Sequence, residues 1–326
     1  MKNFLVKRTL QIIPVLILVS IFSFMVIHLA PGDPLFMYTT PGIAKVELSP
    51  QDEAALRESL GLDGNIIQQY GAWAKNILQG NWGKSVINFQ PVREQIMERL
   101  PATIGLMGAS LALAIIIAIP LGLLAGLHKN KLIDNIISFI TYLGISIPAF
   151  WFGIILIIIF SLNLKLLPSS GMRTVGVYET FDVIKHAILP CIVLSLNNLA
   201  VFVRYIRSST IAQMEEDYVL TAISKGASKK RVLFKHVLKN TLLPTITIIG
   251  LNFASLVTGS LVIETVFGWP GLGTLTMTAI NTRDYPLIMG ITMLTCIILL
   301  IGNFLADILY GIVDPRIKLG KETING

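Results

Sequence analysis

The chain has 326 residues, of which 53% are hydrophobic and only 14% charged. Soluble domains carry about 25% charged residues, so this composition excludes an ordinary soluble domain and favours a membrane protein. The net charge of +7 is divided among loops between apolar runs, so it does not indicate a nucleic-acid partner. Cys191 and Cys296 lie inside apolar runs, which argues against a disulfide framework or a thiolate metal site.

The first predicted element is a membrane span over residues 9–30. This run has no charged residue, follows Lys2, Lys7 and Arg8, and is long enough to cross a bilayer, for which about 20 apolar residues suffice. A signal peptide is the competing interpretation. The run is too long for a typical signal peptide core and lacks a small-x-small cleavage site, so we expect an uncleaved span.

Residues 31–99 form a polar segment that we expect to be a helical extracytoplasmic loop domain. Ser49 and Gly61 mark the ends of one expected helix, and a second is expected over residues 66–78. The triplet Gly83-Lys84-Ser85 is similar to the end of a phosphate-binding loop. That motif needs a glycine at position 78, where this chain has Leu78, so we predict no nucleotide site here.

The rest of the chain contains five further apolar runs, which bring the number of predicted spans to six. They cover residues 101–127, 135–164, 187–203, 240–263 and 285–306. The fourth is expected to continue as one helix past Arg204 and Arg207. Lys and Arg are enriched in the loops on the side of the termini, which places both termini in the cytosol. The predicted domains are therefore residues 1–30, 31–99, a core over 100–311, and a cytosolic tail over 312–326.

Residues 215–244 are a charged stretch between the fourth and fifth predicted spans. Acidic residues begin it, as helix dipoles favour, Gly226 interrupts it, Ser228 can cap a second helix, and Pro244 ends it. The stretch predicts two short helices joined by a sharp corner at the cytosolic surface.

The second of these helices is amphipathic. Arg231, Lys235 and Lys239 share one face, while an apolar face contains Leu233, Phe234, Val237 and Leu238. The basic face suits anionic lipid headgroups. Lipid contact does not account for the corner, nor for the small residues Thr221 and Ala222 before it, so we favour a site where another protein docks.

The sequence offers little for catalysis, and we predict that the protein is not an enzyme, with no catalytic residues, no cofactor and no metal site. The four histidines are dispersed, and no two of them are three or four residues apart. Glu264 and Asp307 are acidic residues at the ends of predicted spans. Either could carry a coupling proton, so an ion-driven secondary carrier stays open as an alternative from another class.

The charged stretch and several ordered blocks resemble the permease subunits of bacterial ABC importers, and more narrowly the dipeptide and oligopeptide "B" subunits of the peptide/nickel family. The charged stretch resembles the EAA loop of that family. The matching blocks are Asp217–Gly226, Lys235–Asn240, Leu243-Pro244, Ala30–Pro34, Leu60–Asp63 with Gln69-Tyr70 and Trp73, Arg99–Thr103, Pro148–Trp151, Glu264–Gly273, Arg283–Pro286 and Asp314–Arg316.

The resemblance implies an all-α membrane protein with the type I ABC importer permease fold, in the cytoplasmic membrane of a bacterium or archaeon. It implies a second homologous permease, cytosolic ATPase subunits and an extracytoplasmic substrate-binding protein as partners. The ATPase-coupling residues would be Glu215, Asp217, Tyr218, Thr221, Ala222, Lys225 and Gly226. An outer gate or a contact with the binding protein would involve Glu264, Phe267, Trp269, Arg283 and Asp284.

The chain departs from the family at the corner. The family usually has arginine near positions 220 and 223 and alanine at 224, where this chain has Leu220, Ile223 and Ser224. We expect these changes to alter which ATPase residues are touched without removing the turn at Gly226. The expected cargo is a di- or oligopeptide, and import of nickel or another small solute is the alternative within the same architecture.

Overall fold

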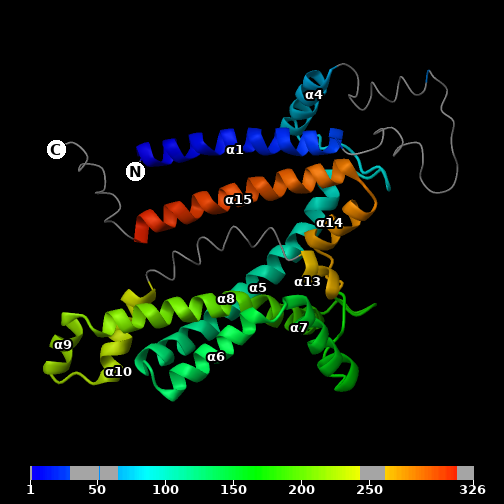
Figure 1. Cartoon of the computed structure of the whole chain (residues 1–326). Helices are drawn as coiled ribbons and strands as arrows, with labels where there is room; N and C mark the ends of the chain where they lie inside the picture. The colour runs from blue at the N-terminus through cyan, green and yellow to red at the C-terminus, as the bar shows by residue number, and fades with distance from the viewer. Residues whose placement is uncertain (1, 30–50, 52–64, 243–260, 314–326) are drawn as a thin grey trace. The chain divides into compact units, whose positions relative to one another are not determined.

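The computed structural model describes residues 2–29, 51, 65–242 and 261–313 (Figure 1). Within these ranges the chain is almost entirely helical, and the β structure is an isolated antiparallel bridge between Lys84 and Pro91. The predicted all-α class is confirmed. The expected helix over residues 49–61, most of the span over 240–263, Pro244 and the tail from residue 314 lie outside the described residues.

Contacts divide the chain into two compact units, and α5 and α15 contribute to both. The first unit comprises Met1–Pro101 and Gly271–Leu300, and the second comprises Ala102–Pro270 and Ile301–Gly326. The first contains α1 (Lys2–Leu29), α4 (Ile66–Leu78), the start of α5 (Val92–Leu127), α14 (Leu272–Asn281) and the first part of α15 (Tyr285–Val313).

Helix α4 is the expected second helix of the loop domain, with the predicted bounds. It begins at a capping box: the Asn65 side chain accepts from the Gln68 N–H at 3.0 Å, and the Gln68 side chain accepts from the Asn65 N–H at 3.1 Å. Tyr70 and Trp73 place their rings 5.5 and 5.8 Å from the ring of Phe24 in α1. Aromatic contacts therefore join the loop domain to the first helix.

The loop before α5 is fastened to the start of α15 by Asp284, which is 1% exposed. Ser85 donates its hydroxyl proton to this carboxylate, and the backbone N–H groups of Val86 and Leu287 donate at 3.4 and 3.3 Å. The hydroxyl of Ser85, the serine of the Gly-Lys-Ser triplet, is therefore engaged in a buried hydrogen bond to a carboxylate.

The second unit is a group of helices around α8. It contains the rest of α5, α6 (Leu132–Ser146), α7 (Ala149–Leu156), the π-helix η1 (Ile157–Asn163), α8 (Thr180–Met214), α9 (Asp217–Ser224), α10 (Lys229–Val232), the π-helix η2 (Leu233–Val237) and α13 (Leu261–Val266). As predicted, α8 continues as one helix past Arg204 and Arg207.

Helices α5 and α8 approach closely at two glycines. A Cβ at Gly122 would lie 2.6 Å from the Cβ of Ile206, and one at Gly126 would lie 2.6 Å from the Cβ of Thr210. Real Cβ atoms do not come so close, so only glycine allows this crossing. The pair is one helical turn apart, the spacing expected for close helix contact in membranes.

The predicted third span, residues 135–164, is not one straight helix. It is broken between Ser146 and Ala149, and the two halves meet at 100°. Pro148 has no N–H and disfavours a helical conformation at the residue before it, and Ile147 is extended, with φ −87° and ψ 127°. The proline expected near the middle of a span therefore divides it.

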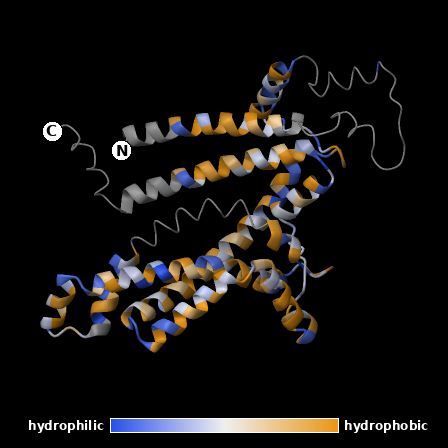
Figure 2. Cartoon of the chain, viewed as in Figure 1, coloured by the Kyte–Doolittle hydropathy of each residue, from blue (hydrophilic) through white to orange (hydrophobic). Residues whose placement is uncertain are grey.

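Three described helices are long and apolar enough to cross a membrane, or four if the bent pair counts as one span. Figure 2 shows mainly hydrophobic residues along α15, a mixture along α8, and hydrophilic residues in the turns beside α9 and α10. The apolar part of α1 that the structure describes covers Leu10–Met25. The count of six spans and the side of each terminus stay predictions.

Candidate functional site

The helical corner after α8 is the candidate functional site, and it forms as the sequence predicts. Helix α8 ends at Met214, and α9 begins with Asp217 in its first turn. Gly226 follows α9 with φ +82°, a left-handed conformation that glycine adopts without a Cβ penalty. The Gly226 N–H donates to the Ile223 carbonyl at 2.9 Å, and the Ala227 N–H donates to the Ala222 carbonyl at 3.1 Å. These bonds satisfy the last carbonyls of α9 and fix the corner.

The second helix of the corner starts at Ser228, the residue that the sequence predicts as its cap. The Ser228 hydroxyl accepts from the Arg231 N–H at 3.4 Å. The helix then continues as the π-helix η2. Leu233 and Val237 are buried, whereas Phe234, which the sequence pattern places on the same apolar face, is 58% exposed. Even at a regular period of 3.6 residues per turn, Phe234 lies about 60° from Arg231 and about 100° from Leu233, so it adjoins the basic face.

Buried valines fill the inside of the corner. Val219 of α9, Val232 of α10 and Val237 of η2 are each 0% exposed. Branched side chains in a close-packed interior hold neighbouring elements at fixed positions. We therefore expect the two short helices to move as one rigid body rather than as a loose loop.

Tyr218 connects this rigid body to the helices on either side. Its hydroxyl donates to the Gln213 side-chain oxygen at 2.8 Å and accepts from the Asn240 side-chain nitrogen at 3.3 Å. Gln213 belongs to the last turn of α8, and Asn240 lies just beyond η2. One half-buried side chain in α9 thus links the chain entering the corner to the chain leaving it.

A second link joins the corner to the loop before α6. The Lys129 ammonium lies 3.0 Å from a carboxylate oxygen of Glu215, at side-chain exposures of 50% and 68%. Exposed ion pairs contribute at most about 1 kcal/mol, so this contact positions the loop more than it stabilises the fold.

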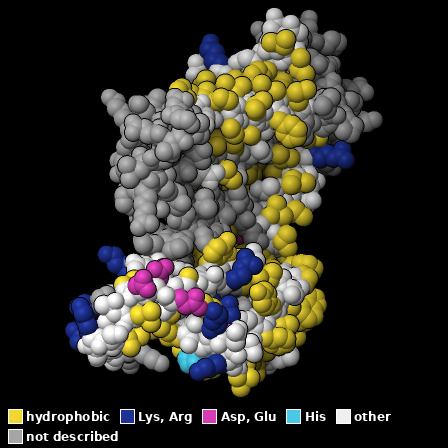
Figure 3. Space-filling view, turned by 60° about the vertical axis from the view of Figure 1, so that its left-hand side comes forward, with side chains coloured by type: hydrophobic (Ala, Val, Ile, Leu, Met, Phe, Trp, Pro, Cys, Tyr) yellow, Lys and Arg dark blue, Asp and Glu magenta, His cyan; other side chains and the backbone are white. Residues whose placement is uncertain are grey.

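The outward surface of the corner is more apolar than the family pattern suggests. Leu220 is 56% exposed and Ile223 38% exposed, and Phe234 lies on the neighbouring helix. Figure 3, in which this end of the molecule comes forward, shows acidic and basic side chains gathered among exposed hydrophobic ones. A surface with an apolar centre and a charged margin is typical of a protein-binding site.

The predicted coupling residues fall into two groups. Glu215, Asp217, Thr221, Lys225 and Gly226 are exposed, while Tyr218 and Ala222 are half-buried. Sequence reasoning missed Gln213 and Asn240 because a hydrogen bond between distant positions leaves no local pattern. It also missed the outward Leu220, Ile223 and Phe234, although the departures from the family at positions 220 and 223 were a usable signal.

Helix α13 and the turn after it contain three of the residues expected at an outer gate, and all three are buried. Glu264 is 0%, Phe267 2% and Trp269 3% exposed. Thr103 donates its hydroxyl proton to Glu264 at 2.8 Å, and the Trp269 indole N–H donates to the Ala102 carbonyl at 3.0 Å. Their side chains support the turn from inside, so they do not form a surface contact in this structure.

The other two residues of that expectation lie in the first unit. Asp284 is the buried anchor of the loop before α5, and Arg283 is exposed, with φ +55°. Of the five residues, Arg283 alone presents its side chain at the described surface. A role for this region in gating or in binding another protein stays a prediction.

Comparison with known protein families gives two matches, which together cover most of the chain. Residues 118–319 match the family described as binding-protein-dependent transport system inner membrane component, and residues 1–107 match the N-terminal component of the same systems.

Full-length relatives agree. The chain is 42% identical over 320 residues to the oligopeptide transport system permease protein AppB of Bacillus subtilis (98% of this chain, 100% of the relative). It is 34% identical over 343 residues to the dipeptide permease DppB of Escherichia coli K12 (98% and 100%). It is 36% identical over 318 residues to the glutathione permease GsiC of the same strain (98% and 99%).

A solved structure shares the fold. It is an inward-facing conformation of the MetNI methionine ABC transporter, with a TM-score of 0.52 and 15% identity, covering 68% of this chain and 97% of that one. At this identity the match concerns the fold alone. The family match and the full-length relatives show that this chain belongs to the inner membrane permease components of binding-protein-dependent ABC importers and is not an enzyme.

Proposed function

We propose that this protein forms half of the membrane pathway of an ABC importer for di- or oligopeptides. A second, homologous permease forms the other half, an extracytoplasmic binding protein delivers the peptide, and cytosolic ATPase subunits supply the energy. The peptide cargo is inferred from relatives named for oligopeptides, dipeptides and glutathione.

The observation that carries this proposal is the rigid corner at the end of α8. Its inside is filled by Val219 and Val232 and its turn is fixed at Gly226, while Leu220 and Ile223 face outward. A partner that grips the outward face moves both helices together. Because Tyr218 ties the corner to α8 and to Asn240, that movement is passed to the membrane helices.

In this function ATP binding shifts the permease pair between inward- and outward-facing states. A partner can shift such an equilibrium only by binding one state better than the other. Leu220, Ile223 and Phe234 form the apolar centre of the proposed ATPase contact, and Glu215, Asp217 and Lys225 its charged margin. Gly226 sets the angle between the two helices that carry them.

The test is ATP-dependent uptake of a labelled dipeptide and of a labelled pentapeptide by the assembled transporter in vesicles. Gly226→Asp adds a negative charge and a side chain at the corner, and aspartate is among the residues that tolerate a left-handed conformation, so the turn itself is expected to persist. We expect uptake to be abolished with membrane insertion unchanged. Gly176→Asp is the matched control, because Gly176 has φ +84° and a Cβ added there, as at Gly226, would have nothing within 4 Å.

Three results would contradict the proposal or a part of it. Normal uptake by the Gly226→Asp transporter would remove the corner from the coupling path. Transport by the two permeases alone, driven by an ion gradient without ATPase subunits, would make the protein a secondary carrier. Uptake of a nickel complex but of neither peptide would keep the architecture and change the cargo.

A further inference from the structure

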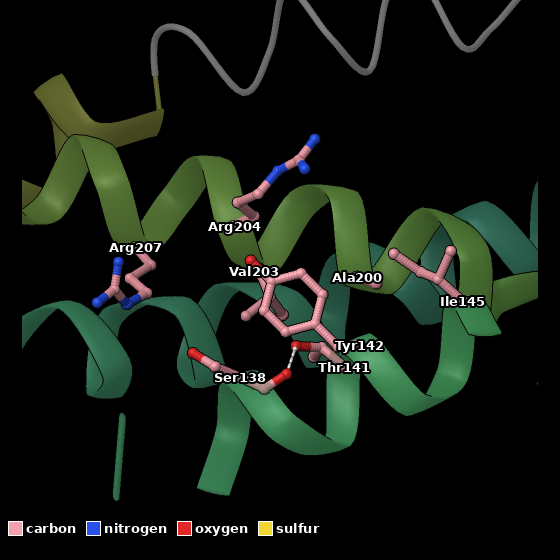
Figure 4. A pocket seen from close by; sticks show the side chains of 8 residues that line it. All are labelled: Ser138, Thr141, Tyr142, Ile145, Ala200, Val203, Arg204 and Arg207. Carbon is pink, nitrogen blue, oxygen red and sulfur yellow. Dashed lines mark hydrogen bonds between the residues drawn. The ribbon is translucent and has the colours of Figure 1, made fainter. Parts of the chain in front are cut away.

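A polar pocket lies between α6 and α8, apart from the corner and from the turn after α13 (Figure 4). Its volume is about 160 Å³, and its lining residues include Ser138, Thr141, Tyr142, Arg204 and Arg207, beside the apolar Ile145, Ala200 and Val203. Cations beside several hydroxyl groups in a small cavity are suited to an anion. The coupling function uses none of these side chains.

One of the two arginines is held in place by a buried carboxylate. Arg207 donates from Nε and Nη2 to the two oxygens of Asp134 at 2.5 and 2.7 Å, and Asp134 is 1% exposed. The Asn130 N–H adds a bond of 2.8 Å to the same carboxylate. A guanidinium has five N–H donors, so this fork fixes the arginine and leaves donors for a ligand.

Arg204 gives the pocket its excess of positive charge. Asp134 offsets the charge of Arg207, whereas Arg204 has no ion pair with any residue that the structure describes, and its guanidinium lies 5.7 Å from the ring of Tyr205. Figure 4 shows its guanidinium pointing away from Ser138, Thr141 and Tyr142, so only a rotation of this side chain brings the charge to a ligand. The pocket therefore has one cation that is fixed and paired with Asp134, and a second, unpaired cation at its edge.

The depth of the pocket along α8 indicates what the anion is. Helix α8 has 35 residues and is about 52 Å long at 1.5 Å per residue, whereas the hydrocarbon core is about 30 Å thick. When α8 is centred on the hydrocarbon core, about 11 Å of the helix extends beyond the core at each end. Arg207 and Arg204 lie roughly 10 and 15 Å from the end of α8 at Met214, where lipid headgroups meet the core.

The rim of the pocket is apolar and exposed. Tyr142 is 57% and Ile145 46% exposed, and the neighbouring Phe139 and Leu143 of α6 are 64% and 44% exposed. Tyrosine is enriched at the membrane interface because its ring is apolar and its hydroxyl polar. Such a rim suits acyl chains better than it suits the polar backbone of a peptide in transit.

We propose that this pocket binds the phosphate group of an anionic phospholipid. Arg204 and Arg207 contact the phosphate oxygens, the Tyr142 hydroxyl donates a further hydrogen bond, and the acyl chains lie along the exposed side of α6. The site is independent of the cargo, so it can be tested without transport.

The experiment is native mass spectrometry of the assembled, detergent-purified transporter after adding phosphatidylglycerol or phosphatidylcholine. We expect at least one phosphatidylglycerol to be retained per permease, and Arg204→Gln to reduce that retention about tenfold. Lys131→Gln is the matched control: it removes one exposed positive charge near the start of α6 without changing the pocket. Tyr142→Phe is the second variant. It keeps the ring and removes only the hydroxyl, so it tests the site even if the Arg204→Gln transporter assembles poorly.

Several outcomes would overturn the proposal. Equal retention by wild type, Arg204→Gln and Tyr142→Phe would show that the lipid binds elsewhere. Equal loss in Lys131→Gln and Arg204→Gln would show general attraction to a charged surface. Release of phosphatidylglycerol by a free peptide, but not by the same peptide with an amidated C-terminus, would assign the pocket to the cargo carboxylate. Release by inorganic phosphate at millimolar concentration would make it a site for free phosphate.

Discussion

At the residue scale, Tyr218 defines how the corner is connected. A hydroxyl bonded to Gln213 on one side and to Asn240 on the other can transmit displacement in either direction. The ring itself is half-buried, so the hydroxyl can be removed without emptying its packing site. A variant that lacks only the Tyr218 hydroxyl therefore tests the hydrogen bonds to Gln213 and Asn240 without changing the packing of the ring.

We therefore predict that Tyr218→Phe leaves the transporter assembled and hydrolysing ATP but lowers the amount of peptide imported per ATP. Loss of roughly 1 kcal/mol of hydrogen bonding corresponds to about a fivefold change. Uptake and phosphate release, measured on the same vesicles, give the ratio. Tyr178→Phe is the control, since Tyr178 is 84% exposed; a ratio that stays the same in Tyr218→Phe would show that the hydroxyl has no part in coupling.

The Asp134–Arg207 pair shows how far single residues can be predicted from sequence. The sequence presents Arg207 only as a charge near the end of a span, and Asp134 only as a loop residue. Their pairing joins α6 to α8 across 73 positions, and no local pattern encodes such a distance. By contrast, the turn at Gly226 and the cap at Ser228 follow from the chemistry of those residues, and the sequence predicts both.

At the element scale, helix bounds are predictable where capping residues or charges mark them. Helix α4 has the predicted bounds, and α8 extends as expected. The sequence pattern reports less where the backbone departs from one straight helix. Pro148 divides a run that is continuously apolar in the sequence, and Phe234, placed on the apolar face by that pattern, is 58% exposed. Apolar composition reports that a segment is buried in membrane or protein, but not how the backbone turns within it.

The contact between α5 and α8 gives an element-scale prediction. Gly122→Ala forces a carbon to within 2.6 Å of Ile206, and overpacking of this kind costs about 1–3 kcal/mol. We expect the temperature at which half of the purified permease aggregates to fall by several degrees. Gly108→Ala on the same helix has nothing within 4 Å of the added carbon and should leave that temperature unchanged or slightly higher, because alanine favours helices.

These two variants differ only in what surrounds the added methyl group. An equal effect of Gly122→Ala and Gly108→Ala would mean that helix propensity, rather than the close crossing, governs the result. No change in either would mean that α5 and α8 can move apart without loss of stability.

At the scale of the whole molecule, the predicted topology places the corner in the cytosol and the loop before α8 outside. The prediction rests on the distribution of basic residues. It can be measured with single cysteines in a chain in which Cys191 and Cys296 are replaced by alanine.

We expect Lys225→Cys to react with a membrane-impermeant maleimide only in inverted vesicles, and Tyr178→Cys only in intact cells. Both positions are exposed, so access to the reagent depends on the side of the membrane. Labelling of Lys225→Cys from outside would reverse the orientation and remove the ATPase contact from the proposed function.

The break between α6 and α7 makes the protein sensitive to the thickness of its membrane. Helix α6 has 15 residues and is about 22 Å long, too short to cross a hydrocarbon layer of about 30 Å. The predicted topology starts α6 at the cytosolic surface, so we expect its far end at Ser146, and the 100° elbow that follows, to lie within the hydrocarbon layer. Lengthening the lipid acyl chains moves the water boundary without lengthening α6, so the elbow must sink deeper or the bilayer must thin around it.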